Sequence, residues 1–203
     1  MEESIKTVTN VNEKANAITY NWQRYSRAKE AGFYYECLWI LYGFAEDRTK
    51  AFFYYLGFTS EKKQSSVTGR KKIKAQVRSI YSMKPEEKNY GFNSFAGKLQ
   101  RMIELIDWVR TDDGEMSDYQ KAIKRAIGPL AFDDSFRDSL LYLNNTWRDM
   151  RNQLTHALMN KDPDAATETV QKLVKNGYPA IRKIDDAVKR LKKKEIRRKF
   201  NIQ

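Results

Sequence analysis

The chain has 203 residues, of which 41% are hydrophobic, and a net charge of +12 at pH 7, so one globular domain with a substantial core is expected. Its longest uncharged apolar run spans residues 37–45 and is far shorter than the roughly 20 residues needed to cross a membrane. The single cysteine, Cys37, excludes an internal disulfide, and the polar N-terminus does not resemble a signal peptide, which favours a cytoplasmic protein with no membrane partner.

Apolar residues spaced three or four apart predict helices along the chain, and no segment shows the alternating pattern of a strand. The expected helices span residues 11–29, 31–58, 70–83, 95–109, 117–127, 134–160 and 164–198. The second of them is the richest in aromatic residues and is the expected core partner of the sixth. The sequence therefore predicts an all-α fold, a helical bundle of about six to seven helices in a single domain over residues 1–203.

Glycine and proline mark the points where these helices are expected to end or bend. Gly43 could break the long second helix, and the Gly-Pro pair at 128–129 should end the fifth. The Gly-Tyr-Pro run at 177–179 should break or kink the last helix. Its basic end, about residues 180–203, would then project from the bundle as a helical arm.

The positive charge is concentrated in two stretches. Residues 61–88 hold nine Lys/Arg against three acids, and residues 182–199 hold ten against three, so the rest of the chain is close to neutral. Such concentration is typical of a surface that binds nucleic acid, although a solvated helix face or a basic tail carries the same charges. Together with Arg148 on the sixth helix, the RNA-binding candidates are Lys71, Lys72, Lys74, Lys192, Lys193 and Arg197.

The sixth expected helix carries the only histidine of the chain, His156. At about 100° per residue, its apolar residues form one stripe of the width that a core-facing helix requires. The stripe consists of Phe136, Leu140, Leu143, Trp147, Met150, Leu154, Ala157 and Leu158. The polar face includes Asn144, Arg151, Asn152 and His156. Arg151 and His156 project at its two margins, about 140° apart, so they either converge on a bound group or are ordinary solvated residues.

The pair Arg151-Asn152, followed by three residues and His156 in a basic all-helical chain, resembles the signature of the HEPN superfamily. The resemblance implies a metal-independent endoribonuclease without a cofactor, built as a homodimer in which two motif helices form a composite active site. It also implies a role in a toxin, abortive-infection or CRISPR-linked antiviral defence system. In HEPN proteins an acidic residue on an earlier helix often supports the motif arginine, and Glu36 and then Asp47 are the candidates here.

The residue types of the motif suit cleavage of single-stranded RNA. A neutral imidazole, whose ordinary pKa is about 6.5, can take the proton from a ribose 2′-OH, which then attacks the adjacent phosphate. Arg151 offers a planar fork of donors to the phosphate oxygens as charge develops, and Asn152 can orient the imidazole or an oxygen. DNA should be spared because it lacks the 2′-OH.

Two other classes of function stay open. The first is a non-catalytic RNA-binding bundle, in which the basic stretches bind and His156 is incidental. The second is an interaction protein regulated by a partner such as an antitoxin, whose polar motif face is an interface. Mutation of Arg151 or His156 would leave the activity of an RNA-binding bundle unchanged. Dimerisation without RNA affinity would favour the interaction protein.

Overall fold

The computed structural model describes residues 10–59, 75, 77–81, 92–111, 114–157, 160 and 162–202. All regular secondary structure in these residues is helical, and they contain no strand. The predicted all-α bundle of about six to seven helices is thus confirmed for the described part of the chain. None of the helices described is long and apolar enough to cross a membrane.

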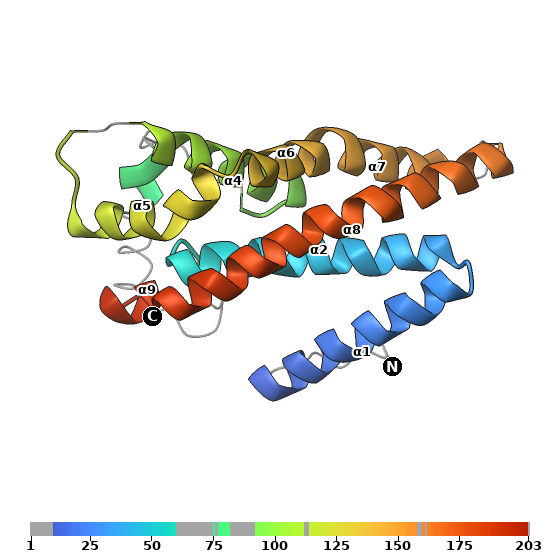
Figure 1. The fold of residues 1–203 in the computed structure, drawn as a ribbon, viewed down its shortest axis with the longest axis horizontal. Coiled ribbons are helices and arrows are strands. Elements are labelled where there is room, and N and C mark those ends of the chain that lie inside the picture. Colours follow the sequence, from blue (N-terminus) through green and yellow to red (C-terminus); the bar gives the residue numbers. More distant parts are fainter. Residues whose placement is uncertain are drawn as a thin grey trace, which may run out of the picture.

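Two long helices, α2 (Tyr34–Leu56) and α8 (Pro163–Lys194), lie side by side and run in the same direction through the bundle (Figure 1). Helix α1 (Val11–Glu30) packs back along α2. The remaining helices are α4 (Phe95–Arg110), α5 (Asp118–Ala131), α6 (Asp134–Leu141), α7 (Arg148–Ala157) and the short α9 (Ile196–Lys199). Of the expected basic helix at 70–83, residues 77–81 are described and are helical.

Helix α2 is continuous, so the expected break at Gly43 is wrong. A glycine inside a helix is unfavourable by only about 1 kcal/mol, and α2 is held on both sides by α1 and α8. Fully buried side chains such as Leu41 and Phe52 flank the glycine along the helix. The helix ends at Gly57, whose φ of +84° is the left-handed conformation that glycine adopts at helix ends.

Two prolines that should have ended or bent helices lie inside them instead. Pro129 falls in the last turn of α5, which continues to Ala131, and Pro179 lies within an uninterrupted α8. A proline inside a helix removes one backbone hydrogen bond and is unfavourable by about 3 kcal/mol. In both helices the residues that follow the proline are buried in the core, among them Leu130 and Ile181. Tertiary packing therefore holds the helices together across both prolines.

Gly177 has a packing role in α8 rather than a hinge role. The indole of Trp147, which is fully buried, lies directly over it, and a Cβ at residue 177 would come within 2.4 Å of the indole Nε1. The same Nε1 donates a hydrogen bond of 3.1 Å to the carbonyl of Leu173. The absence of a side chain at Gly177 is thus what lets the indole reach the backbone of α8.

Replacing Gly177 with alanine should therefore lower the free energy of unfolding, although alanine is the better helix former. The gain in helix propensity is about 1 kcal/mol, whereas forcing a methyl group against a buried ring costs about 1–3 kcal/mol. Gly128→Ala is the matched control, because a Cβ there meets nothing within 4 Å and should stabilise α5. Chemical denaturation of both variants checks this, and a stabilised Gly177→Ala protein would contradict the packing role.

The expected motif helix is continuous but contains a π-helical turn. It consists of α6, the π-helical turn η1 (Tyr142–Trp147) and α7, and the wider turn is closed by a bond from the N–H of Arg148 to the carbonyl of Leu143. The predicted apolar stripe is confirmed at Phe136, Leu140, Leu143, Trp147 and Leu154, all of which are buried. π-Helical turns are uncommon and often occur at functional sites.

Asn144 departs from the prediction, because it lies in the π-helical turn and is buried instead of lying on a solvated face. Its amide nitrogen donates to Gln100 at 3.4 Å and its oxygen accepts from Arg148 at 3.1 Å. These hydrogen bonds satisfy the polar group inside the protein.

The basic C-terminal segment does not project as an arm. Val188 and Leu191 of α8 are buried, and so are Ile196 and Ile202 beyond its end. The chain turns at Glu195, which has a φ of +52°, and α9 then folds back onto the bundle. The apolar residues interspersed among the lysines and arginines account for the difference, because they bury the segment against α2 and α5.

The buried Tyr25 and Tyr119 and the partly buried Tyr81 make the stability of the protein sensitive to high pH. Burial raises the pKa of Tyr25 to about 12 and raises the pKa of Tyr81 and Tyr119 well above the ordinary value. In the unfolded chain these phenols ionise near pH 10. The stability that they contribute is therefore complete below about pH 10 and is lost as the pH rises toward their folded pKa values.

We expect the free energy of unfolding to fall by about 1.4 kcal/mol per pH unit for each such tyrosine above about pH 10. Denaturant titrations at a series of alkaline pH values measure this slope. Tyr25→Phe should make the slope shallower, whereas Tyr20→Phe, at a side chain that is 57% exposed, should leave it unchanged. Equal slopes for the native protein and Tyr25→Phe would contradict the assignment.

Candidate active site

A cavity of about 910 Å³ lies between α1, α2 and α7. Its wall is mostly apolar, and its charged lining residues are Lys14, Arg24, Glu36, Asp47 and Arg151. The residues of α1 that line the cavity lie between Lys14 and Arg24. Its size and its few polar groups are typical of a ligand-binding site. One of those groups is the arginine of the sequence motif.

Arg151 projects from α7 onto the ring of Tyr42 in α2. Its guanidinium carbon lies 4.0 Å from the centre of that ring. Both Arg151 and the carboxylate of Glu46 lie close enough to the hydroxyl of Tyr42 to act on it. Burial and the charge of Glu46 raise the pKa of the Tyr42 hydroxyl, and the charge of Arg151 opposes this shift. The contacts hold the guanidinium in one orientation, as preorganised binding of a phosphate requires.

Tyr42 is itself fixed by two aromatic neighbours. Its ring stacks on Trp147 with ring centres 6.4 Å apart, and meets Phe95 of α4 edge to face at 5.6 Å. Trp147 closes the π-helical turn, and Arg151 lies four residues further along, on the same face of the helix. The π-helical turn therefore sets the position of both side chains that contact Tyr42.

A second cation, Lys98 of α4, lies near Glu46. Lys98 is only 8% exposed, and burial lowers its pKa while the nearby charge of Glu46 opposes that shift. Glu46 thus lies close to a buried cation and to the hydroxyl of Tyr42. Perturbed ionisable groups of this kind are frequent at functional sites.

The two acids expected to support Arg151 line the same cavity but form ion pairs with other residues. Glu36 pairs with Arg24 of α1. Asp47 pairs with Lys14 of α1 at 2.6 Å and with its neighbour Arg48. The acid that lies close to the hydroxyl of Tyr42, on which Arg151 stacks, is Glu46, one turn along α2 from the aromatic ring.

The other motif residues follow Arg151 on α7. Asn152 is half-buried beside it. His156 lies on the same helix one and a half turns further on, and its side chain lies outside the part that the structure describes. The helical backbone preserves the predicted spacing between Arg151 and His156.

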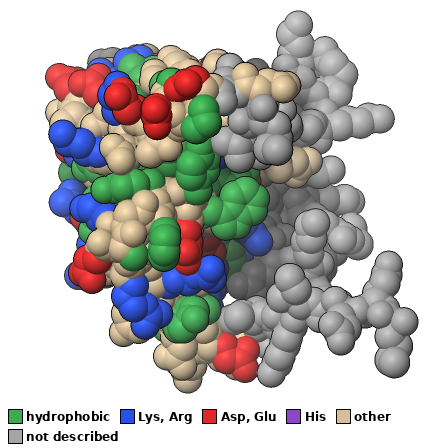
Figure 2. Space-filling view, turned by 90° about the vertical axis from the view of Figure 1, so that its right-hand side faces the viewer, with side chains coloured by type: hydrophobic (Ala, Val, Ile, Leu, Met, Phe, Trp, Pro, Cys, Tyr) green, Lys and Arg blue, Asp and Glu red, His purple; other side chains and the backbone are tan. Residues whose placement is uncertain are grey.

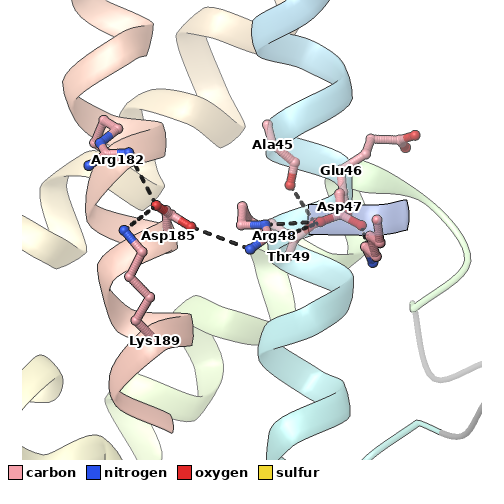
Figure 3. A network of polar contacts seen from close by, with 9 residues as sticks. Ala45, Glu46, Asp47, Arg48, Thr49, Arg182, Asp185 and Lys189 are labelled. Carbon is pink, nitrogen blue, oxygen red and sulfur yellow. Dashed lines mark hydrogen bonds and ion pairs between the residues drawn. The ribbon is translucent and has the colours of Figure 1, made fainter. Parts of the chain in front are cut away.

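Asp47 and Arg48 belong to a polar network that joins α2 to α8 (Figure 3). Asp185 of α8 is buried and accepts from Arg48 at 3.4 Å, from Arg182 at 3.3 Å and from Lys189 at 2.8 Å. A buried carboxylate needs such partners. Part of the basic stretch at 182–199 therefore has a structural role.

The predicted RNA-binding residues are not equivalent in the structure. Arg197 donates to the carbonyls of Tyr54 and Thr59 at the end of α2 and lies over the ring of Tyr54, so its guanidinium anchors α9. Arg148 pairs with Asp149 at 2.9 Å. Lys192 and Lys193 are exposed on α8. The remaining candidates, Lys71, Lys72 and Lys74, lie outside the described residues.

Several aromatic side chains remain at the surface near the cavity. Trp39 lines it and is 66% exposed, and Phe33 at the turn between α1 and α2 is 62% exposed. Figure 2, which views the end of the molecule that carries this turn, shows hydrophobic side chains at the surface between charged ones. Exposed aromatics of this kind suit stacking on unpaired bases or contact with a partner protein.

Sequence reasoning missed Tyr42, Glu46 and Lys98 as site residues. In the sequence, Tyr42 resembles the many other aromatic core residues of its segment. Glu46 belongs to the polar run that follows them. The sequence signal that was available is the spacing of Tyr42 and Glu46, because residues four apart on a helix are neighbours. Their link to Arg151 depends on how α2 packs against α7.

Comparisons of this chain with models of protein families, with curated proteins and with solved structures each find no match. The assignment of a function therefore depends on the residues and geometry of the site itself.

Proposed function

We propose that this protein is a metal-independent endoribonuclease of the HEPN type that cleaves single-stranded RNA. The observation that carries the proposal is the fixed position of Arg151, stacked on Tyr42 at the wall of a ligand-sized cavity. The same helix also carries Asn152 and His156. This combination offers a permanent cation for a phosphate and a group that can move a proton at neutral pH.

In the proposed reaction the imidazole of His156 takes the proton of a ribose 2′-OH, and the oxygen attacks the adjacent phosphorus. The bond from phosphorus to the 5′-oxygen breaks, and that oxygen leaves with a proton. Arg151 stabilises the charge that builds on the phosphate oxygens, while Asn152 orients the imidazole or one of those oxygens. The products are a 2′,3′-cyclic phosphate and a 5′-hydroxyl.

The leaving oxygen needs an acid, and each chain has one histidine. A homodimer that apposes two α7 helices about a two-fold axis supplies a second imidazole to the same cleft. We therefore propose a composite active site, in which Glu46 takes the supporting role expected of Glu36 or Asp47. From the resemblance of the motif to HEPN proteins, we further propose a role in a toxin or antiviral defence system, under the control of an antitoxin or another regulatory partner.

A non-catalytic RNA-binding bundle is the alternative, and the exposed Lys192 and Lys193 on α8 favour it. Such a protein would bind RNA through its basic surfaces, and its affinity would fall steeply with salt. It would leave the RNA intact and would be indifferent to Arg151 and His156.

The test is incubation of the protein with single-stranded RNA, and with DNA of the same sequence, in the presence of EDTA. We expect the RNA to be cut to products with 2′,3′-cyclic phosphate and 5′-hydroxyl ends and the DNA to remain intact. An RNA with 2′-deoxyribose at the cleavage position should also remain intact. Cleavage that stops in EDTA or that extends to DNA would contradict the proposed chemistry.

A further inference from the structure

A second cleft, of about 420 Å³, lies between α5 and the corner where α8 ends and α9 begins. Its lining contains one acid, Asp118, and four cations, which are Lys121, Arg125, Lys194 and Lys199. Lys194 and Lys199 belong to the basic stretch at residues 182–199, whereas Lys121 and Arg125 lie outside both basic stretches. The excess of positive charge in one concave site identifies an anion as its ligand.

The local structure explains why these cations converge. Lys121 and Arg125 are four residues apart on α5 and project from the same face of that helix. The left-handed conformation of Glu195 ends α8, and α9 then carries Lys199 to the cleft that Lys194 already lines. All four side chains are exposed, and none forms an ion pair with another described residue.

The floor of the cleft is apolar. Ile196 and Ala126 are buried there, and Phe200 packs edge to face on Tyr119 with ring centres 5.2 Å apart. A low-dielectric floor beneath charges of one sign concentrates their field on the cleft. The cleft therefore attracts phosphate groups more strongly than isolated surface lysines do.

We propose that this cleft binds the phosphodiester backbone of single-stranded RNA and anchors the strand at a distance from Arg151. The exposed Arg190 lies one turn before Lys194 on the same face of α8 and extends the positive surface beyond the cleft, which suits an elongated polyanion rather than a compact one. Helices α5 and α9 lie near one end of the molecule, whereas α7 lies toward the other (Figure 1). The choice of RNA as the ligand rests on the proposed function, but binding at the cleft does not require cleavage.

The test compares RNA binding by the native protein, a cleft variant and a control of equal charge, using fluorescence anisotropy of a labelled oligouridylate with 2′-O-methyl ribose, which the proposed reaction cannot cut. The cleft variant is Lys121→Gln with Arg125→Gln. The control is Arg27→Gln with Lys175→Gln, at two exposed side chains outside the cleft. Each phosphate contact contributes about 0.7 to the slope of log affinity against log salt for single strands.

We expect the cleft variant to bind at least tenfold more weakly at low salt, with a slope shallower by about 1.4, and the control to bind like the native protein. A cleft variant with native affinity and slope would overturn the inference, and so would a control that weakens binding equally. Binding is measured separately from cleavage. If Arg151→Ala abolishes cleavage but the cleft substitutions still weaken RNA binding, this inference stands. If the native protein cleaves RNA and the cleft variant binds RNA as tightly as the native protein does, this inference is wrong but the proposed function still stands.

Discussion

Replacing Arg151 with lysine or alanine should lower the rate of RNA cleavage by about 10²–10³-fold, the effect of removing one preorganised donor from a developing oxyanion. Lysine keeps the charge, but it cannot present a planar fork of donors to the phosphate. It also cannot reproduce the stacking of the planar guanidinium on the ring of Tyr42. Both substitutions should therefore impair cleavage to a similar degree.

The matched control for Arg151 is Arg24→Gln. Arg24 lines the same cavity but pairs with Glu36, so its removal should change the cleavage rate only a few-fold. Single-turnover rates with saturating enzyme separate this effect from weaker RNA binding. Arg151→Lys with native activity, or an equal loss in both variants, would contradict the role assigned to Arg151.

Replacing Trp147 with alanine should lower the free energy of unfolding by about 3–5 kcal/mol, the range for a buried tryptophan. Trp147 has no exposed surface, packs over Gly177 and donates a hydrogen bond to the carbonyl of Leu173. Its loss leaves a cavity at the centre of the bundle. Because a domain is stable by only about 5–15 kcal/mol in total, this change removes a large share of the stability.

Trp39→Ala is the control for Trp147→Ala, because Trp39 is 66% exposed. Its removal should change the free energy of unfolding by less than about 1 kcal/mol. Denaturant-induced unfolding followed by circular dichroism compares the two variants. Equal destabilisation would mean that the tryptophan at the π-helical turn is not the packing centre that the structure indicates.

The sequence predicted the features that local chemistry determines. The helices expected to start at residues 117 and 134 start within one residue of those positions, where Ser117 caps α5 through a capping box with Gln120 and Asp133 caps α6. Five residues of the predicted apolar stripe of the motif helix are buried, namely Phe136, Leu140, Leu143, Trp147 and Leu154. These features could be predicted because they depend on residues within a few positions of one another.

The features that the sequence did not predict depend on packing between distant segments. The prolines at 129 and 179 are accommodated because the residues around them are buried. The π-helical turn places Trp147 and Arg151 on Tyr42, and periodicity at about 100° per residue does not describe such a turn. The role of Glu46 and the convergence of cations between α5 and α9 likewise appear only once the helices are assembled.

The central claim is that the motif on α7 cleaves RNA without a metal ion. The measurement that tests it most directly is the rate of cleavage of labelled single-stranded RNA in EDTA by the native protein and by His156→Ala. We predict cleavage by the native protein and a rate at least 100-fold lower for the variant, with unchanged RNA binding. Equal rates for the two proteins, or RNA that the native protein binds but leaves intact, would contradict the claim.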